Sequence, residues 1–197
     1  MLTKSNSLPS YYKIKNCGVL YEFLAFDIKR DFNKVLKWMH EPHVIPQWQL
    51  NKDKIELGVY FEKMIIDDHQ KLFIIKISGR SVGYLEIYEA KRDRLSLYYD
   101  ADEHDMGWHI LLGESDVVGK GHFRTIMRMI CFFIFENSFA EKIVGEPDVN
   151  VKSYQYVADQ IAFESQGVID MLEKKATLYH CYRKNFYHLH SVYPFDV

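Results

Sequence analysis

Apolar residues along the chain follow two spacings, and these divide it into short helices and strands. In four segments they recur every three or four positions, which is the spacing of a helix with one buried face. Elsewhere they form runs of strand length bounded by turn-forming residues. We predict helices over residues 31–40, 53–67, 122–137 and 153–163. We predict strands over residues 11–26 with a break at 16–18, two strands over 72–90 with a turn at 78–81, and strands over 95–99, 106–112, 142–145, 168–172 and 176–186.

The predicted order of elements indicates the fold class. A strand and two helices come first, followed by an antiparallel meander of three or four strands. A helix, a strand, a second helix and a pair of strands complete the chain. A strand–helix–strand unit inside an otherwise antiparallel sheet implies an α+β protein with a mixed, mostly antiparallel sheet flanked by helices. No repeat or linker divides the sequence, so we expect one domain over residues 1–197.

A glycine pair stands where a predicted strand turns into the longest predicted helix. Gly119-Lys120-Gly121 directly precedes the helix that begins near His122. The start of a helix presents unpaired backbone N–H groups, and glycine lets a ligand approach the backbone closely. Together they form a site for an anion such as a pyrophosphate, to which Lys120 and Arg124 add positive charge. The same residues also fit a simple strand-to-helix turn, and neither a Walker loop nor a dinucleotide GxGxxG motif is present.

Composition and charge narrow the classes of function. Aromatic residues make up 15% of the chain, which favours a substantial core and permits a small-molecule pocket. The net charge of −2 and the lack of a long basic run argue against nucleic-acid binding over a broad basic face. No apolar stretch reaches the ~18 residues of a membrane span, and the N-terminus lacks the apolar core of a signal peptide. Three widely spaced cysteines suit a reducing compartment, so we expect a cytoplasmic protein.

Several motifs, taken together and in order, resemble the GNAT acyltransferases. They are GWHILLG at 107–113, VGKG at 118–121 before a long helix, and KIVGEPDV at 142–149. More closely, the chain resembles the siderophore-biosynthesis branch that acylates N-hydroxylated amines, which includes hydroxylysine acetyltransferases of aerobactin-type pathways and mycobactin lysine acyltransferases. HEPHVIPQWQL at 40–50 and EKKATLYHCYRKNF at 173–186 resemble further segments of that branch. The match therefore covers most of the chain.

The resemblance implies a GNAT fold with acyl-coenzyme A bound where the central sheet splays. The co-substrate would be acetyl-coenzyme A or another acyl-coenzyme A, and we expect no permanently bound cofactor and no metal. Its pyrophosphate would lie on the backbone at the start of the long helix, and backbone groups of the preceding strand would polarise the thioester carbonyl. The residues that this assigns to the co-substrate are Leu111, Val118, Gly119, Lys120, Gly121, His122 and Phe123.

His109 and Asp148 match the two positions that are proposed to be catalytic in this branch. An amine that attacks a thioester must lose a proton, and histidine is the side chain that ordinarily serves as a base near neutral pH. His109 would take the proton, and Asp148 would either orient His109 or hold the acceptor. Apart from the resemblance, a lone strand histidine is more often structural, and an aspartate after proline more often caps a helix. Glu146 is the alternative carboxylate.

Three further side chains are assigned to the acceptor. His43 and Trp48 match the acceptor-side segment of the branch and lie in a proline-containing loop, and loops on rigid scaffolds commonly carry specificity. Trp108 belongs to the strand motif beside His109. The sequence departs from the family at Asp116, where the general GNAT loop begins with Gln or Arg, and after the EPD motif, where Asn150-Val151 replaces Arg-Asn.

Other candidate residues are assigned to structure. Trp38 lies on the apolar face of a predicted helix, so we expect it in the core. The histidines and cysteine of the C-terminal segment, His180, Cys181, His188 and His190, do not complete an established zinc spacing. The long helix is expected to bury Ile126, Met129, Ile130, Phe133 and Ile134.

Our principal hypothesis is an acyl-coenzyme A-dependent N-acyltransferase that converts an N-hydroxylated amine into a hydroxamate. The amine would attack the thioester directly in a ternary complex, and the enzyme would be a monomer or a homodimer. One alternative is an enzyme similar to aminoglycoside 6′-acetyltransferases, with acceptor carboxylates from the loop at 100–105 and from Glu86 and Glu89. The other is a non-catalytic module that binds coenzyme A.

Overall fold

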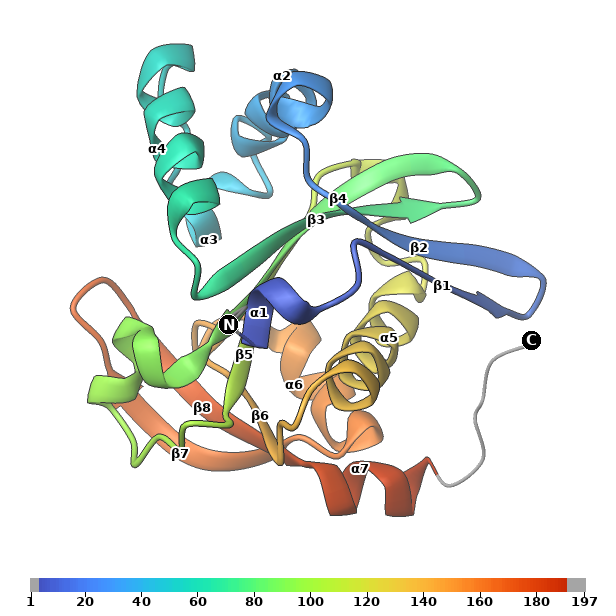
Figure 1. The fold of residues 1–197 in the computed structure, drawn as a ribbon, viewed down its shortest axis with the longest axis vertical. Helices are drawn as coiled ribbons and strands as arrows, with labels where there is room; N and C mark the ends of the chain where they lie inside the picture. Colours follow the sequence, from blue (N-terminus) through green and yellow to red (C-terminus); the bar gives the residue numbers. More distant parts are fainter. Residues whose placement is uncertain (1–3, 191–197) are drawn as a thin grey trace. The chain divides into compact units, whose positions relative to one another are not determined.

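A computed structural model describes residues 4–190 of the protein (Figure 1). The α-helices are α1 Lys4–Ser7, α2 Ile28–Met39, α3 Ile45–Trp48, α4 Lys54–Ile66, α5 His122–Asn137, α6 Lys152–Ala158 and α7 Arg183–Leu189. The strands are β1 Tyr11–Asn16, β2 Val19–Ala25, β3 Gln70–Ile77, β4 Arg80–Glu89, β5 Met106–Leu112, β6 Lys142–Gly145, β7 Glu164–Asp170 and β8 Lys175–Tyr182. Short 3-10 helices occur at Ala90–Arg92, Arg94–Leu97, Ser115–Val117 and Asp159–Ile161.

The strands form one mixed sheet in the order β1-β2-β3-β4-β5-β6-β8-β7. β2 pairs antiparallel with β1 and β3, and β8 pairs antiparallel with β6 and β7. β5 and β6 pair in parallel, at Met106↔Ile143 and Gly107↔Val144. This parallel pair is the strand–helix–strand unit predicted from the sequence, so the α+β class with a mixed, mostly antiparallel sheet is confirmed.

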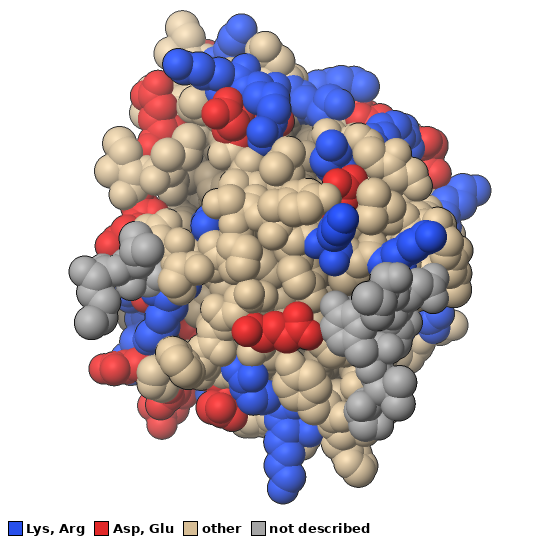
Figure 2. Space-filling view, turned by 45° about the vertical axis from the view of Figure 1, so that its right-hand side comes forward, with Lys and Arg blue, Asp and Glu red and all other residues tan. Residues whose placement is uncertain are grey.

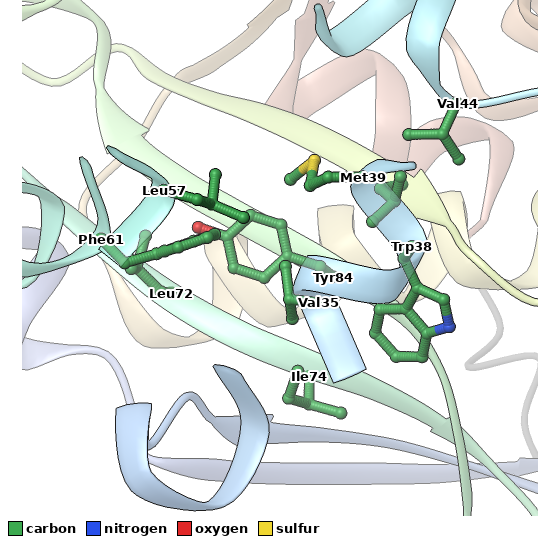
Figure 3. Close-up of a cluster of buried hydrophobic side chains, with 10 residues drawn as sticks. Val35, Trp38, Met39, Val44, Leu57, Phe61, Leu72, Ile74 and Tyr84 are labelled. Atoms are coloured by element: carbon green, nitrogen blue, oxygen red, sulfur yellow. The ribbon is translucent and has the colours of Figure 1, made fainter. Parts of the chain in front are cut away.

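The chain divides into two compact units. Among the described residues, one comprises residues 4–87 and 109–123, and the other comprises residues 88–108 and 124–190. In the first unit, α2 and α4 pack against β3 and β4 (Figure 1). Their apolar side chains form a buried cluster with strand residues (Figure 3). It contains Val35, Trp38, Met39, Val44, Leu57, Phe61, Leu72, Ile74, Tyr84 and Leu111.

Both predicted N-terminal helices form, with aspartates at their starts. Asp27 caps α2 by accepting from Arg30 N, so this helix begins three residues before the predicted segment. Asp53 caps α4. Trp38 is fully buried, as predicted. In α4 the inward face carries Leu57 and Phe61, whereas several of its other apolar residues, Ile55, Val59 and Ile66, are exposed.

Three elements of the second half have the predicted bounds, one predicted strand does not form, and the strand predicted over 168–172 is β7, which runs from Glu164 to Asp170. β5, α5 and β6 have the predicted bounds. Residues 95–99 do not form a strand, because the Asp93 carboxylate accepts a hydrogen bond from Leu95 N and starts a 3-10 turn. The helix predicted over 153–163 begins at Lys152 and is α-helical to Ala158 before a 3-10 turn. The long helix buries all five residues predicted to lie in the core.

The final strand is shorter than predicted, because Arg183 begins a helix. β8 ends at Tyr182, and the guanidinium of Arg183 donates to three backbone carbonyls at and beyond the end of α5. These are Phe135 O at 2.7 Å, Ala140 O at 2.8 Å and Ser138 O at 2.9 Å. The carbonyls at a helix C-terminus lack intrahelical partners, so one side chain satisfies groups that would otherwise need water. The helix α7 continues to Leu189, and residues 191–197 lie outside the described part.

The described residues were compared with the requirements of a membrane span, a metal site and a charged binding surface. No helix within residues 4–190 is long and apolar enough to cross a membrane, and no group of three or more His, Cys, Asp or Glu side chains in that range is arranged to hold a metal ion. On the face drawn in Figure 2, acidic and basic side chains both occur, with broad areas of uncharged side chains between them.

We expect Arg183→Met to lower the free energy of unfolding by about 2–4 kcal/mol, because three carbonyls lose a charged donor. Urea or thermal unfolding measures the change. The neighbouring, exposed Lys184 provides the matched control, and Lys184→Met should stay within about 0.5 kcal/mol of the wild type. Equal stability of the two variants would contradict this account of the end of α5.

Candidate active site

His109 of β5 is paired with a buried carboxylate. Its Nδ1 lies 2.9 Å from Oε2 of Glu86 on β4. The other oxygen of Glu86 accepts a hydrogen bond from the Tyr84 hydroxyl at 3.0 Å. The Glu86 side chain is 4% exposed and that of His109 is 24% exposed. Tyr84 is fully buried, and burial, with the Glu86 charge adding to it, raises the pKa of its hydroxyl well above the usual value.

The chemistry of this trio follows from its donors and acceptors. Tyr84 keeps its proton and donates it, and a carboxylate oxygen accepts. The imidazole therefore donates from Nδ1 to Glu86, which puts the lone pair of the neutral ring on Nε2. A partly exposed histidine with that tautomer is equipped to accept a proton. Glu86 stands two residues from Tyr84, so both side chains lie on the same face of β4.

The loop before α4 is attached to the backbone of β5 by two side chains. His43 Nε2 donates to Leu112 O at 2.9 Å, and Trp48 Nε1 donates to Ile110 O at 3.3 Å. The Trp48 ring lies edge-on to His109, with 6.4 Å between centroids, and 5.7 Å from the ring of Tyr84. The loop predicted to contact the acceptor thus borders the predicted base, and its ring nitrogens hold it on the strand.

The glycine loop has the backbone form that an anion cradle needs. Gly119 and Gly121 have φ of 73° and 84°, the left-handed region that favours glycine. Nothing lies within 4 Å of a Cβ built on either of them, so conformation rather than crowding requires glycine there. α5 begins directly afterwards at His122, whose Nδ1 is 2.8 Å from the Tyr21 hydroxyl. Lys120 is exposed.

Asp116, which departs from the family pattern, carries its own counter-ion. Arg80 Nη2 lies 2.7 Å from Oδ2 of Asp116, and Arg80 Nη1 lies 3.9 Å from Oε2 of Glu114. Glu114 in turn accepts from Trp38 Nε1 at 2.9 Å. The carboxylate near the glycine loop is therefore balanced by a guanidinium, which reduces its repulsion of a bound phosphate.

Two predicted site residues belong to the other compact unit. Asp148 accepts hydrogen bonds from Asn150 N at 2.8 Å and from Asn150 Nδ2 at 2.9 Å, which is a turn before α6. Trp108 is buried against Tyr154 and Phe163, with ring centroids 5.5 and 6.2 Å apart. Its indole N–H is buried and has no hydrogen-bond partner. Trp108 thus serves the core, and its contact with an acceptor stays a prediction.

The first unit brings together most of the predicted site. His109, His43, Trp48, Leu111 and the loop 118–123 all belong to it. Glu86 is the partner of His109 in the structure, whereas the sequence indicated it only as a possible acceptor carboxylate. The available signal was a charged residue inside an otherwise apolar strand, where burial demands a partner.

Comparison with known proteins identifies the family. Residues 27–171 match the family described as acetyltransferase (GNAT) domain, which is more than half of the chain. The protein is a GNAT acetyltransferase. N-hydroxyputrescine acetyltransferase of Acinetobacter baumannii is 55% identical over 187 residues, covering 95% of this chain and 89% of that protein. Lysine N-acyltransferase MbtK of Mycobacterium tuberculosis is 24% identical over 150 residues, covering 76% and 71% of the two chains.

A solved structure supports the fold of this GNAT acetyltransferase. An uncharacterised protein from Bacillus halodurans superposes with a TM-score of 0.88 at 28% identity, covering 92% of this chain and 95% of that chain. The resemblance to GNAT acyltransferases and the GNAT fold are therefore confirmed. So are the enzyme class, an acyl-coenzyme A-dependent N-acyltransferase, and the co-substrate, acetyl-coenzyme A or a related thioester.

We expect Gly121→Ala to lower the free energy of unfolding of this GNAT enzyme by about 1 kcal/mol, because alanine is strained in the left-handed region. Gly58 in the interior of α4 is the matched control. A Cβ there meets Phe32 at 3.8 Å, an ordinary contact, so Gly58→Ala should stabilise by up to about 1 kcal/mol. Chemical denaturation measures the change in the free energy of unfolding of each variant. A stabilising Gly121→Ala would be inconsistent with the loop geometry.

Proposed function

We propose that the protein acetylates a short N-hydroxylated diamine, of which N-hydroxyputrescine is the leading candidate, to form a hydroxamate. The observation that carries the proposal is the 55% identity with an N-hydroxyputrescine acetyltransferase over nearly the whole of both chains. We further propose that the hydroxamate enters a siderophore for iron acquisition, because its two oxygens chelate ferric iron. The enzyme would act in the cytoplasm, as a monomer or a homodimer.

In this proposal His109 is the catalytic base. A hydroxylamine nitrogen is far less basic than an alkylamine and is neutral at pH 7, so it attacks without prior deprotonation. Its nitrogen forms a bond to the thioester carbonyl carbon, and the proton that it then carries passes to Nε2 of His109. Collapse of the tetrahedral adduct breaks the C–S bond, and the departing coenzyme A thiolate takes up that proton. No acyl-enzyme is formed.

The co-substrate would bind at the glycine loop and β5. The first N–H groups of α5 and the open backbone of Gly119 and Gly121 suit the pyrophosphate, with Lys120 adding positive charge. Backbone groups near Leu111 would polarise the thioester carbonyl. The remaining predicted contacts come from Val118, His122 and Phe123. Support for this assignment lies in the two left-handed glycines immediately before a 16-residue helix.

The acceptor would be held at its far end as well as at its reacting end. Trp48 borders His109 with its ring edge-on, which suits an aliphatic chain passing over it. Together with His43 and Trp108, it forms the proposed acceptor set. Asp148 would supply the negative charge for the distal ammonium of a diamine.

Release of coenzyme A from acetyl-coenzyme A tests the function directly. The acceptors are N-hydroxyputrescine, N-hydroxycadaverine, N-hydroxylysine, putrescine and an aminoglycoside, and hydroxamate formation is scored by its ferric complex. We expect turnover on a hydroxylated diamine and a loss of about 10²–10⁴-fold in kcat for His109→Ala, the range ordinarily supplied by a general base.

Each other outcome of this assay has a definite meaning. Turnover on the aminoglycoside alone would replace the proposed function with antibiotic acetylation. Binding of coenzyme A without turnover on any acceptor would favour a non-catalytic module. Wild-type turnover in His109→Ala would remove the base from the mechanism.

Asp148→Asn tests the ammonium contact. Asparagine keeps the turn at this position but removes the charge. We expect KM for the diamine to rise up to about fivefold, because an exposed ion pair contributes up to about 1 kcal/mol, with kcat nearly unchanged. Asp170, whose side chain is 81% exposed, supplies the control variant Asp170→Asn. An unchanged KM in Asp148→Asn would remove this residue from acceptor binding.

A further inference from the structure

We propose that Glu86 is a positioning residue for His109, and that Tyr84 in turn holds Glu86. The carboxylate keeps the imidazole proton on Nδ1, so that the lone pair on Nε2 is directed to the reacting nitrogen. This inference rests on the proposed function, in which His109 accepts the proton. It adds a role that neither the sequence motifs nor the family resemblance assigns to Glu86.

The geometry restricts the carboxylate at both oxygens. Oε2 lies 2.9 Å from His109 Nδ1, and Oε1 accepts from the Tyr84 hydroxyl at 3.0 Å. Rotation of the carboxylate would break one of these hydrogen bonds, and the Glu86 side chain is too deeply buried for water to replace it readily. Tyr84 itself is clamped in the apolar cluster between α2, α4 and the sheet (Figure 3).

Two other buried carboxylates among the described residues, Asp105 and Glu146, have a lysine where Glu86 has a histidine. Asp105 accepts from Tyr99 and lies 3.0 Å from Lys142 Nζ. Glu146 accepts from Tyr88 and lies 3.5 Å from Lys174 Nζ. Each of these two therefore combines a tyrosine donor with a permanent cation, which offsets the cost of burying the charge.

Glu86 has the tyrosine donor, but an imidazole occupies the place of the lysine. An imidazole gains charge only when it accepts a proton. The electrostatic partner of Glu86 is thus a group that becomes cationic during the reaction. When Nε2 takes the proton of the attacking nitrogen, the imidazolium forms 2.9 Å from a fixed negative charge, which favours that step.

Glu86→Gln is the informative substitution. It keeps the size of the side chain, but an amide offers one acceptor and one donor where the carboxylate offers two acceptors. If the amide oxygen serves Tyr84, its NH₂ group faces His109 Nδ1 and drives the imidazole proton to Nε2. We expect kcat on the hydroxylated diamine to fall about 10- to 1,000-fold, bounded by the loss in His109→Ala, with KM for acetyl-coenzyme A within about twofold.

A spectroscopic readout separates positioning from simple loss of structure. In the wild type with ¹⁵N-labelled histidine, at a pH where the ring is neutral, we expect the His109 proton on Nδ1. In Glu86→Gln the proton should move largely to Nε2. Tyr84→Phe, which removes only the outer hydrogen bond, should lower kcat less than Glu86→Gln does.

Glu22→Gln is the matched control, because Glu22 is also a buried strand carboxylate that accepts from a tyrosine, Tyr11, at 2.8 Å. It should keep wild-type turnover, and far-UV circular dichroism and thermal unfolding check that all variants fold. Wild-type kcat in folded Glu86→Gln, or an imidazole proton on Nε2 in the wild type, would overturn the proposal. If no hydroxylated amine is turned over, the proposed function fails, whereas the tautomer measurement still tests the Glu86–His109 pair by itself.

Discussion

The arrangement of the candidate active site depends on hydrogen bonds to the backbone carbonyls of β5. Buried backbone carbonyls must be paired, and β6 pairs with the first two residues of β5, Met106 and Gly107. Farther along the strand, side chains of the loop before α4 supply donors to Ile110 O and Leu112 O. The loop is therefore placed by the backbone of the strand that carries His109. The pairing of strand carbonyls thus places the Trp48 ring beside His109, the predicted base.

Buried carboxylates explain part of the unusual tyrosine content, 14 residues in the chain. Four tyrosine hydroxyls, each from a different residue, donate to four buried acidic side chains: Tyr11 to Glu22, Tyr84 to Glu86, Tyr88 to Glu146, and Tyr99 to Asp105. Burial is the first cause of the raised pKa of Tyr84, Tyr88 and Tyr99, and the nearby carboxylate adds to it. Each of these hydroxyls consequently remains a donor near neutral pH, where an ionised phenol would repel its partner.

The sequence predicted well those features of the fold that depend on interactions between residues close together in the chain. The bounds of β5, α5 and β6 followed from runs of apolar residues, and the glycine loop followed from residues that tolerate positive φ. The 3-10 turn at Arg94–Leu97 escaped because its apolar residues also suit a strand, and one Asp93 side-chain hydrogen bond decides between the two. The early end of β8 depends on Arg183 reaching carbonyls more than 40 residues away along the chain. The pairing of Glu86 with His109 spans 23 residues and two strands, so sequence spacing alone does not reveal it.

The Asp116 position shows how a departure from a family pattern is compensated. A carboxylate close to a pyrophosphate site opposes anion binding, but Arg80 lies 2.7 Å away and neutralises it. Both partners are about half exposed or more, so the pair contributes little to stability. The pair instead fixes the orientation of the Asp116 carboxylate, which is turned toward the Arg80 guanidinium. With the acidic side chain engaged, the anion affinity of the loop depends on the N–H groups at the start of α5 and on the backbone freedom of its two glycines, neither of which requires a Gln or Arg at position 116.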